Sequence, residues 1–170
     1  KEEILRDFSK LGYKVSYKVL IASDYGTPQN RRRAIFVGLH DGKKFDFPKK
    51  SVEIPVTTFE ALSDLPKDSV EDGNNYPFKP QSDYQRFIRK NANKLYNHQI
   101  TNHTPETLRI IAMVPDGGNY KNLPKEMWSL RKVHIAWTRM NSQKPCFTID
   151  TGHRHHFHYK YNRIPTVRES

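Results

Sequence analysis

The sequence predicts an α+β fold in which a helix and two strands are joined to a small mixed domain. Apolar residues first recur at helical spacing, then alternate with period two, and after residue 40 the chain becomes charged and irregular. This change predicts a domain boundary near residues 40–55. With 170 residues and 12% aromatic residues, the chain is long enough to bury a core and too aromatic for a disordered segment.

The elements of the first part follow one another closely. Apolar spacing predicts an amphipathic helix over residues 2–11 that buries one face, and Gly12 is typical of a left-handed helix end. Residues 13–20 alternate as a strand, and a loop follows. The apolar run 34–38 predicts a second strand that is covered on both faces.

Helix-start signals mark the second part. Thr57 and Glu60 have the spacing of a capping box for a short helix. Thr104 as N-cap and Pro105 in the first turn predict a further helix, with Leu108 and Ile111 on its buried face. Trp128 and Trp137 are predicted to belong to the core, because large aromatic side chains dominate small cores.

Charge favours a polyanionic partner. The net charge is +11, and residues 76–170 hold 16 Lys or Arg against 6 Asp or Glu. A generally basic, soluble surface is the alternative. No apolar run approaches the roughly 18 residues needed to cross a bilayer, so we expect no membrane association. The single cysteine, Cys146, cannot form an internal disulfide, which agrees with a reducing compartment.

Three adjacent arginines enter the second strand. Side chains alternate along a strand, so Arg31 and Arg33 are expected on one side and Arg32 on the other. Two guanidinium groups on one face can grip a phosphate or a base edge. A solvated basic strand entrance is the alternative explanation.

Two motifs resemble those of a known family. Residues 22–38, which read Ala-Ser-Asp-Tyr-Gly-Thr-Pro-Gln-Asn-Arg-Arg-Arg-Ala-Ile-Phe-Val-Gly, are similar to the Gln-x-Arg-x-Arg motif region of the DNA cytosine-C5 methyltransferases. Residues 163–170, Arg-Ile-Pro-Thr-Val-Arg-Glu-Ser, resemble the opening of that family's next motif. The stretch between the two is where the family keeps its variable target-recognition domain.

The resemblance implies an architecture and roles for residues. Residues 1–39 would be the edge of a Rossmann-like methyltransferase sheet, 40–162 a target-recognition domain, and 163–170 a return to the catalytic domain. Gln29, Arg31 and Arg33 would organise the pocket of the target cytosine. Arg163 and Arg168 would brace the recognition domain against the catalytic domain.

The resemblance also implies partners. The full-length enzyme would methylate double-stranded DNA with S-adenosylmethionine, in the bacterial cytoplasm, as part of restriction-modification. The family's glycine-rich cofactor loop, Pro-Cys nucleophile motif and Glu-Asn-Val motif have no counterpart at the expected places here. We therefore expect this chain alone to be inactive, to bind no cofactor, and to need an amino-terminal catalytic region from the same or a separate chain.

Basic residues interleaved with aromatic residues are the candidates for DNA contact. A basic helix is predicted over residues 83–94, with Tyr84, Phe87 and Ile88 on its apolar side; a solvated helix face is the alternative. The predicted DNA-binding residues are Arg86, Arg89, Lys90, Arg131, Lys132, Arg139 and Arg154.

Two further patterns resemble a catalytic motif and a metal site, but we predict neither function for them. Pro145-Cys146 spells the dipeptide of the family's nucleophile motif, but its position matches a Pro-Ser-x-Thr-Ile segment, so Cys146 is predicted to be a small buried side chain. The histidines between residues 153 and 158 would alternate between opposite faces of a strand, which separates the ligands of a zinc site. No metal site is predicted.

Two other functions remain open at this point. The chain could be a DNA- or RNA-binding module without catalysis, or a subunit that complements a separate catalytic chain, because the same basic surface would serve either role. A hydrolase that uses Cys146 with a histidine is the third interpretation.

Overall fold

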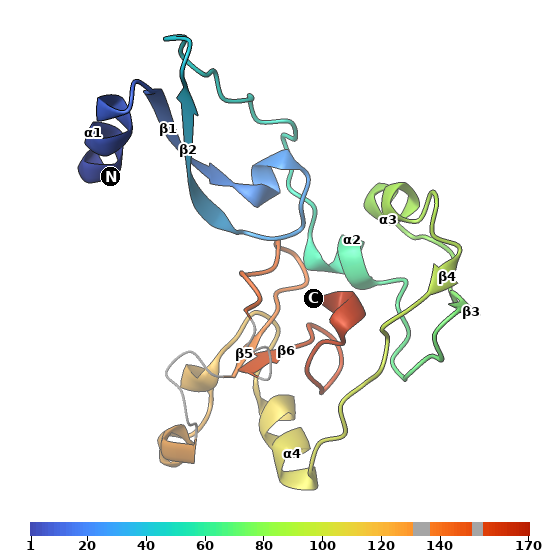
Figure 1. The fold of residues 1–170 in the computed structure, drawn as a ribbon. Coiled ribbons are helices and arrows are strands. Elements are labelled where there is room, and N and C mark those ends of the chain that lie inside the picture. Colours follow the sequence, from blue (N-terminus) through green and yellow to red (C-terminus); the bar gives the residue numbers. More distant parts are fainter. Residues whose placement is uncertain (131–136, 151–154) are drawn as a thin grey trace.

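The computed structural model describes residues 1–130, 137–150 and 155–170. Figure 1 shows an amino-terminal helix with a strand pair and, joined to it by a long extended segment, a larger part of short helices and two-residue strands. The carboxy terminus lies between these two parts, beside α2. The mixture of helices and small sheets agrees with the predicted α+β class.

The first part has the predicted order of elements. Helix α1 (Glu2–Lys10) is followed by β1 (Lys14–Ile21), the 3-10 turn η1 (Ala22–Tyr25) and β2 (Arg32–Leu39). The two strands pair antiparallel. Gly12 has φ +86°, the left-handed conformation expected after the helix.

The apolar faces of this part are not covered, which differs from the prediction. No residue of α1 is buried, and Phe8 and Leu11 are 47% and 67% exposed. In β2, Ile35 is 37% exposed. The reason is the size of the sheet: β1 and β2 form a two-stranded ribbon, and among the described elements α1 and the short η1 contact β1.

The second part is built from short elements. They are α2 (Thr58–Leu62), β3 (Asn74–Asn75), α3 (Asp83–Ile88), β4 (Lys94–Leu95), α4 (Pro105–Met113), η2 (Tyr120–Asn122), η3 (Lys125–Leu130), β5 (Thr138–Arg139), β6 (His156–Phe157) and η5 (Val167–Glu169). Strand β3 pairs antiparallel with β4, and β5 pairs parallel with β6. None of the described helices is long and apolar enough to cross a membrane.

The predicted helix starts are confirmed. The Glu60 N–H donates to Thr57 Oγ1 at 3.2 Å, and the Thr57 N–H donates to Glu60 Oε2 at 2.8 Å, so the capping box is complete. At α4, the Thr107 N–H donates to Thr104 Oγ1 at 3.2 Å, and Pro105 occupies the first turn.

The basic helix predicted over residues 83–94 is shorter and turned differently. It ends at Ile88, after which the chain enters β4 to pair with β3. Phe87 is 77% exposed, whereas Gln85 is fully buried. The Gln85 amide explains this orientation, since its Nε2 donates to Ser63 Oγ at 2.9 Å and its Oε1 accepts from the Gln81 N–H at 2.6 Å.

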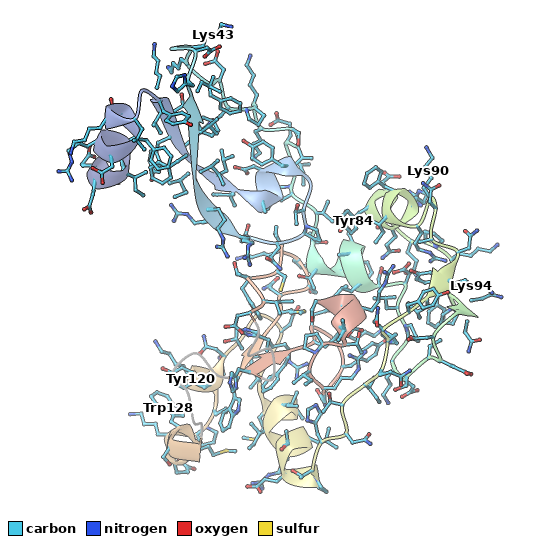
Figure 2. The ribbon with its side chains drawn as sticks, in the orientation of Figure 1. Lys43, Tyr84, Lys90, Lys94, Tyr120 and Trp128 are labelled. Carbon is cyan, nitrogen blue, oxygen red and sulfur yellow. The ribbon has the colours of Figure 1, made fainter. Side chains whose placement is uncertain are left out.

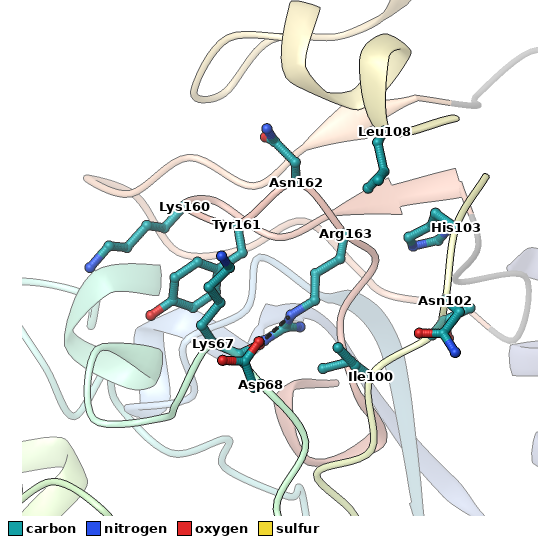
Figure 3. Close-up of a pocket in the computed structure, with 11 residues that line it drawn as sticks. Lys67, Asp68, Ile100, Asn102, His103, Leu108, Lys160, Tyr161, Asn162 and Arg163 are labelled. Atoms are coloured by element: carbon teal, nitrogen blue, oxygen red, sulfur yellow. Dashed lines mark hydrogen bonds between the residues drawn. The ribbon is translucent and has the colours of Figure 1, made fainter. Parts of the chain in front are cut away.

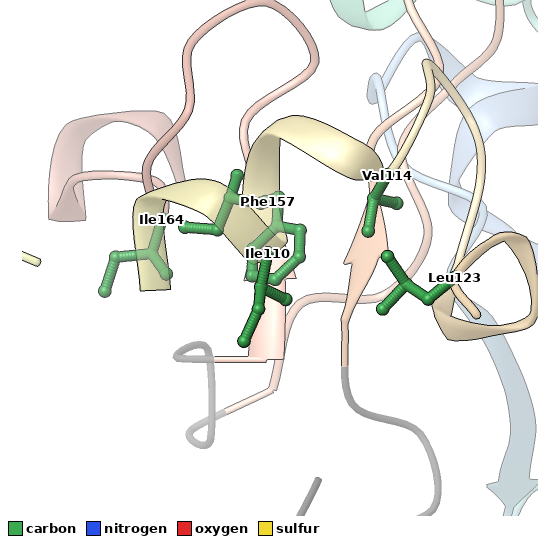
Figure 4. Close-up of a cluster of buried hydrophobic side chains, with 6 residues drawn as sticks. Ile110, Val114, Leu123, Phe157 and Ile164 are labelled. Atoms are coloured by element: carbon green, nitrogen blue, oxygen red, sulfur yellow. The ribbon is translucent and has the colours of Figure 1, made fainter. Parts of the chain in front are cut away.

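The hydrophobic core of the second part lies against α4 (Figure 4). Trp128 and Trp137 are partly buried against it, which confirms their predicted place. Helix α4 buries Ile111 as predicted, but Leu108 is 41% exposed and Ile110 takes its place. The cluster consists of Ile110, Ile111, Val114, Leu123, Phe157 and Ile164.

Candidate functional site

The arginine run begins where the two parts of the protein meet. Gly26, at φ +84°, ends η1 in the left-handed conformation and turns the chain toward residues 27–31. Ser23 Oγ donates to Asn30 Oδ1 at 2.8 Å, and the Ala22 N–H donates to the Arg31 carbonyl at 2.9 Å. These two hydrogen bonds therefore fix Asn30 and Arg31 at the start of the arginine run.

All three arginines of this run are exposed. Within the described ranges, none of them forms an ion pair with a carboxylate; the guanidinium of Arg33 donates to the Arg32 carbonyl at 2.7 Å. Uncompensated guanidinium groups attract anions, and their fixed fork favours bidentate contact with phosphate. The run is thus an exposed positive site at the junction.

Gln29 lies at the same junction, half-buried. It lines a cavity of about 160 Å³ together with residues from α2, from the segment around Cys146 and from the carboxy terminus. Pro28, Glu169 and Ser170 also line this cavity, so the first forty residues and the last eight meet there.

A backbone bridge fixes the strand entrance from the other side. The Asn30 N–H donates to the Cys146 carbonyl at 2.7 Å, and the Cys146 N–H donates to the Pro28 carbonyl at 2.9 Å. Cys146 itself is buried, and burial raises the pKa of its thiol to about 12. A thiol that stays protonated at neutral pH is not a nucleophile, so Cys146 contributes structure here.

Arg163 is buried and forms a bidentate ion pair with Glu169. Its guanidinium donates to both carboxylate oxygens of Glu169, at 2.6 and 2.8 Å, and also to the Lys67 carbonyl at 3.1 Å. Burial raises the pKa of Glu169, but the hydrogen bond from Arg163, the charge of Arg163 and the backbone hydrogen bond from Thr166 are among the causes that together outweigh this, and the pKa lies below its usual value. The ion pair fixes the Arg163 side chain, and the hydrogen bond from Arg163 to the Lys67 carbonyl joins the carboxy-terminal segment to the loop after α2.

Arg168 also contacts the segment between α2 and α4. Its guanidinium donates to the Tyr76 hydroxyl, and its backbone N–H donates to the Asn97 carbonyl at 3.0 Å. Both predicted bracing arginines therefore contact residues between 66 and 97. Sequence reasoning missed Glu169, although its spacing from Thr166 is that of a capping box, which the structure forms.

Two buried histidines complete this cluster. His158 Nδ1 accepts the Lys160 and Tyr161 N–H groups, each at 3.0 Å, and Nε2 lies 3.6 Å from Glu169 Oε1. Burial lowers the pKa of His158 to about 3. Burial also lowers the pKa of His98, whose Nε2 faces the Pro66 carbonyl at 3.0 Å. Both rings are neutral at neutral pH. Neither was predicted from the sequence.

The predicted DNA-binding residues fall into three groups. Arg86 and Lys90 are exposed, and Figure 2 shows Lys90 on the outer side of α3. Arg89 is engaged within the protein: it pairs with Asp64 at 2.8 Å and stacks 3.7 Å from the centre of the Tyr76 ring. Outside the described residues lie Arg131, Lys132 and Arg154.

The prediction that Arg139 contacts DNA is wrong. The side chain is buried, and its guanidinium donates to the carbonyls of Ile111 and Val114 at the end of α4 and of His158. A guanidinium whose donors are all used inside the core has none left for a phosphate. Arg139 is a structural residue whose guanidinium satisfies backbone carbonyls at the carboxy-terminal end of α4.

A larger cavity lies elsewhere on the second part (Figure 3). It has a volume of about 640 Å³ and is bounded by residues 67–68, 100–103, 108 and 160–163. Its lining includes the ammonium-bearing Lys67 and Lys160, and the ring of His103, whose Nε2 accepts the Ile164 N–H at 3.3 Å. None of its lining residues comes from the arginine run.

Pro28 and Gln29, just before the arginine run, and the carboxy-terminal segment 163–170 meet at one junction. All 170 residues match the family described as C-5 cytosine-specific DNA methylase. The chain belongs to this family. Since the matched residues are those of the whole chain, the methylase relationship includes both motifs and the stretch between them.

Curated methylases of this kind are similar over nearly the whole chain. A type II methyltransferase of Haemophilus parahaemolyticus, M1.HphI, is 32% identical over 169 residues, which cover 99% of this chain and 40% of the relative. M.DdeI of Desulfomicrobium norvegicum is 34% identical over 190 residues, covering 99% and 46%. The chain thus spans less than half the length of these relatives.

A solved structure has the same fold. It is a protein assigned as a DNA modification methyltransferase encoded within a prophage (E. coli), with a TM-score of 0.69 and 18% identity. The match covers 99% of this chain and 51% of that one. The described arrangement of the methylase chain is therefore shared with a protein to which it has little sequence identity.

Proposed function

We propose that these 170 residues form the target-recognition part of a DNA cytosine-C5 methyltransferase. Residues 1–39 belong to the edge of its catalytic sheet, 40–162 form the recognition domain and 163–170 return to the catalytic domain. The observation that carries the proposal is the exposed, unpaired arginine run at the meeting point of these segments. Family membership supports it, and the whole enzyme is expected to be more than twice as long, as its relatives are.

In this proposal, Gln29, Arg31 and Arg33 organise the pocket for a cytosine that has been swung out of the duplex. Extrusion costs a few kcal/mol of lost stacking and pairing. Guanidinium groups that grip the phosphate beside the extruded base, or its polar edge, offset that cost. Gln29 lies at the same junction, where it lines the small cavity.

The methyl donor of this family is S-adenosylmethionine, and the described residues do not fit it. The adjacent glycines 117 and 118 are the nearest match to a cofactor loop, but they are packed against protein. A Cβ on Gly117 would lie 2.3 Å from Asn141 Nδ2, and one on Gly118 would lie 2.7 Å from the Pro115 ring. We therefore propose that cofactor binding belongs to a region outside these residues, in the same or a separate chain.

DNA contact is proposed for the exposed cations Arg86 and Lys90, and for Arg131, Lys132 and Arg154. Contacts of this kind go mainly to phosphates, so they supply affinity that falls as salt rises. Specificity needs base contacts in addition.

The proposal is tested by methyl transfer. The full-length protein that contains this chain is incubated with duplex DNA and labelled S-adenosylmethionine, and methylated cytosines are mapped in the product. We expect transfer to C5 of cytosine, and a loss of about 100-fold for Arg33→Ala, as is typical when a positioning contact is removed. Arg6→Ala, which removes an exposed arginine from α1, is the matched control and is expected to keep full activity.

Binding gives a second measurement. Titration of duplex DNA at several salt concentrations is expected to show an affinity that falls steeply with salt. An affinity indifferent to salt, or a full-length protein that transfers no methyl group to DNA, contradicts the proposal. Activity that appears only after mixing with a separate amino-terminal chain would identify the split form of the same enzyme.

A further inference from the structure

Residues 142–146 run between the arginine entrance and the first turn of α2. The Thr58 N–H and Oγ1 both donate to the Lys144 carbonyl at 2.9 Å, and the Phe59 N–H donates to the Ser142 carbonyl at 3.1 Å. At its far end, Cys146 exchanges two backbone hydrogen bonds with the segment before Arg31. We call residues 142–146 the strut, because one short stretch of backbone bonds to both sides.

One side chain fixes the near end of the strut. The carboxylate of Asp116 accepts the Ser142 N–H at 2.8 Å on Oδ1, and it accepts the Ser142 hydroxyl at 2.5 Å on Oδ2. Both carboxylate oxygens of Asp116 therefore accept hydrogen bonds from Ser142. Bonds to an ionised acceptor are about twice as strong as neutral ones.

Backbone hydrogen bonds hold the loop that carries Asp116 against β5 and the residue that follows it. The Gly117 N–H donates to the Met140 carbonyl at 3.2 Å, and the Arg139 N–H donates to the Gly118 carbonyl at 2.9 Å. Gly117 has φ +68° and lies so close to Asn141 that no Cβ fits. A continuous set of bonds therefore runs from the end of α4 and from β5, through Asp116 and the strut, to the backbone before Arg31.

We infer that Asp116 is a positioning residue for base extrusion. The inference rests on the proposed function, in which Arg31 and Arg33 grip the DNA at the extruded cytosine. Asp116 holds Ser142, Ser142 holds the strut, and the strut sets where the arginine run lies relative to the recognition domain. When Asp116 is removed, DNA still binds through phosphate contacts, but the arginines are no longer held in place for the extruded base.

The experiment uses the full-length protein, with the methylated site first mapped on the unaltered protein's product. Asp116→Ala, Ser142→Ala and the double variant are compared with Asp72→Ala. Asp72 is a matched control, since it is an exposed carboxylate that accepts a backbone N–H, that of Asn97 at 2.7 Å, and it has no bond to the strut. Three quantities are measured: duplex affinity at fixed salt, fluorescence of 2-aminopurine placed at the target cytosine, and the single-turnover transfer rate.

For Asp116→Ala we expect a transfer rate about 10-fold lower or more, because small displacements of positioning groups have effects of that size. The fluorescence gain that reports extrusion falls in parallel, while duplex affinity stays within about two-fold. Ser142→Ala acts in the same direction, and the double variant is no worse than Asp116→Ala, because the two residues act through one contact. Asp72→Ala behaves like the unaltered protein.

The inference is overturned if Asp116→Ala transfers and extrudes like Asp72→Ala, if its rate falls only as far as its DNA affinity, or if the two single effects add in the double variant. Should Asp116→Ala fail to fold, Asp116→Asn keeps the volume and one acceptor oxygen, and an extrusion signal equal to that of the unaltered protein then overturns it. Absence of methyl transfer by the unaltered protein contradicts the proposed function instead, so the two failures are distinguishable.

Discussion

At the level of single residues, Arg139 shows how burial changes the meaning of a basic side chain. In the sequence it stands in a cationic and aromatic stretch that is typical of DNA contact. In the structure its guanidinium supplies donors to the end of α4, where helix carbonyls have no partners of their own. A buried cation held by carbonyls is a structural element, and its removal leaves those carbonyls unsatisfied.

Replacement of Arg139 should therefore lower the stability of the protein. We expect Arg139→Lys to reduce the free energy of unfolding by about 2 kcal/mol or more, because a single ammonium cannot satisfy acceptors arranged around a planar fork. Urea unfolding measures this change. Arg109→Lys, an exposed arginine on the same helix, is the control. Equal unfolding midpoints for the two variants would refute the structural role of Arg139.

His158 should make stability depend on pH. Its pKa in the folded protein is about 3, well below the ordinary value near 6.5, so the unfolded chain binds a proton over that interval and the folded chain does not. Its stabilising contribution is complete above about pH 6.5 and is lost as pH falls toward 3, by about 1.4 kcal/mol for each pH unit. His98, whose pKa is also lowered by burial, acts in the same direction. Urea midpoints across pH 4 to 8 measure this loss.

The control for this prediction is His158→Asn, which keeps an acceptor for the Lys160 and Tyr161 N–H groups but cannot be protonated. We expect its midpoint to vary less with pH than that of the unaltered protein. A steep dependence that survives His158→Asn would show that other groups cause it.

At the level of elements, local signals predicted helix starts well and helix faces less well. The caps at Thr57 and Thr104 involve residues three positions apart, so the sequence contains the whole interaction. The face that a short helix buries depends instead on its neighbours. Helix α3 buries Gln85 because Ser63, 22 residues away, receives its amide hydrogen bond.

The cap of α4 gives a prediction at this level. Thr104→Ala removes the side-chain oxygen that accepts the Thr107 N–H, and it should lower the free energy of unfolding by about 1 kcal/mol. Because α4 carries Ile110 and Ile111 of the core cluster, the loss should be global and not confined to local fraying. Thr101→Ala, an exposed threonine just before the helix, is the control. Indistinguishable unfolding curves would show that the cap contributes nothing.

At the level of the whole molecule, the amino-terminal part presents an apolar face of α1 that the described residues leave partly exposed. Exposed members of this face are Ile4, Phe8 and Leu11, and Val19 and Ile35 are exposed on opposite faces of the strand pair. A covering layer agrees with the proposed place of residues 1–39 at the edge of a larger catalytic sheet.

If the full-length protein covers this face, Leu11 becomes buried there. Leu11→Glu should then lower the free energy of unfolding of the full-length protein by about 2 kcal/mol, the size of the effect of burying a leucine side chain. Ile54→Glu, at a position that is 85% exposed in the extended segment, is the control and should change it by less than about 0.5 kcal/mol. Equal, small effects at both positions, measured by urea unfolding, would show that the face stays open to water.

The sequence by itself determined the α+β class, the first helix and strand pair, the two helix caps and the family, because each depends on residues close together in the chain or on short motifs. Only the tertiary structure decided that Arg139 is internal, that Arg163 pairs with Glu169 while also bonding to Lys67, 96 positions away, and that Asp116 holds the strut. The physical reason is that a charged side chain has the same local pattern whether it faces water or a buried partner. Which of the two it meets is settled by distant segments that pack against it.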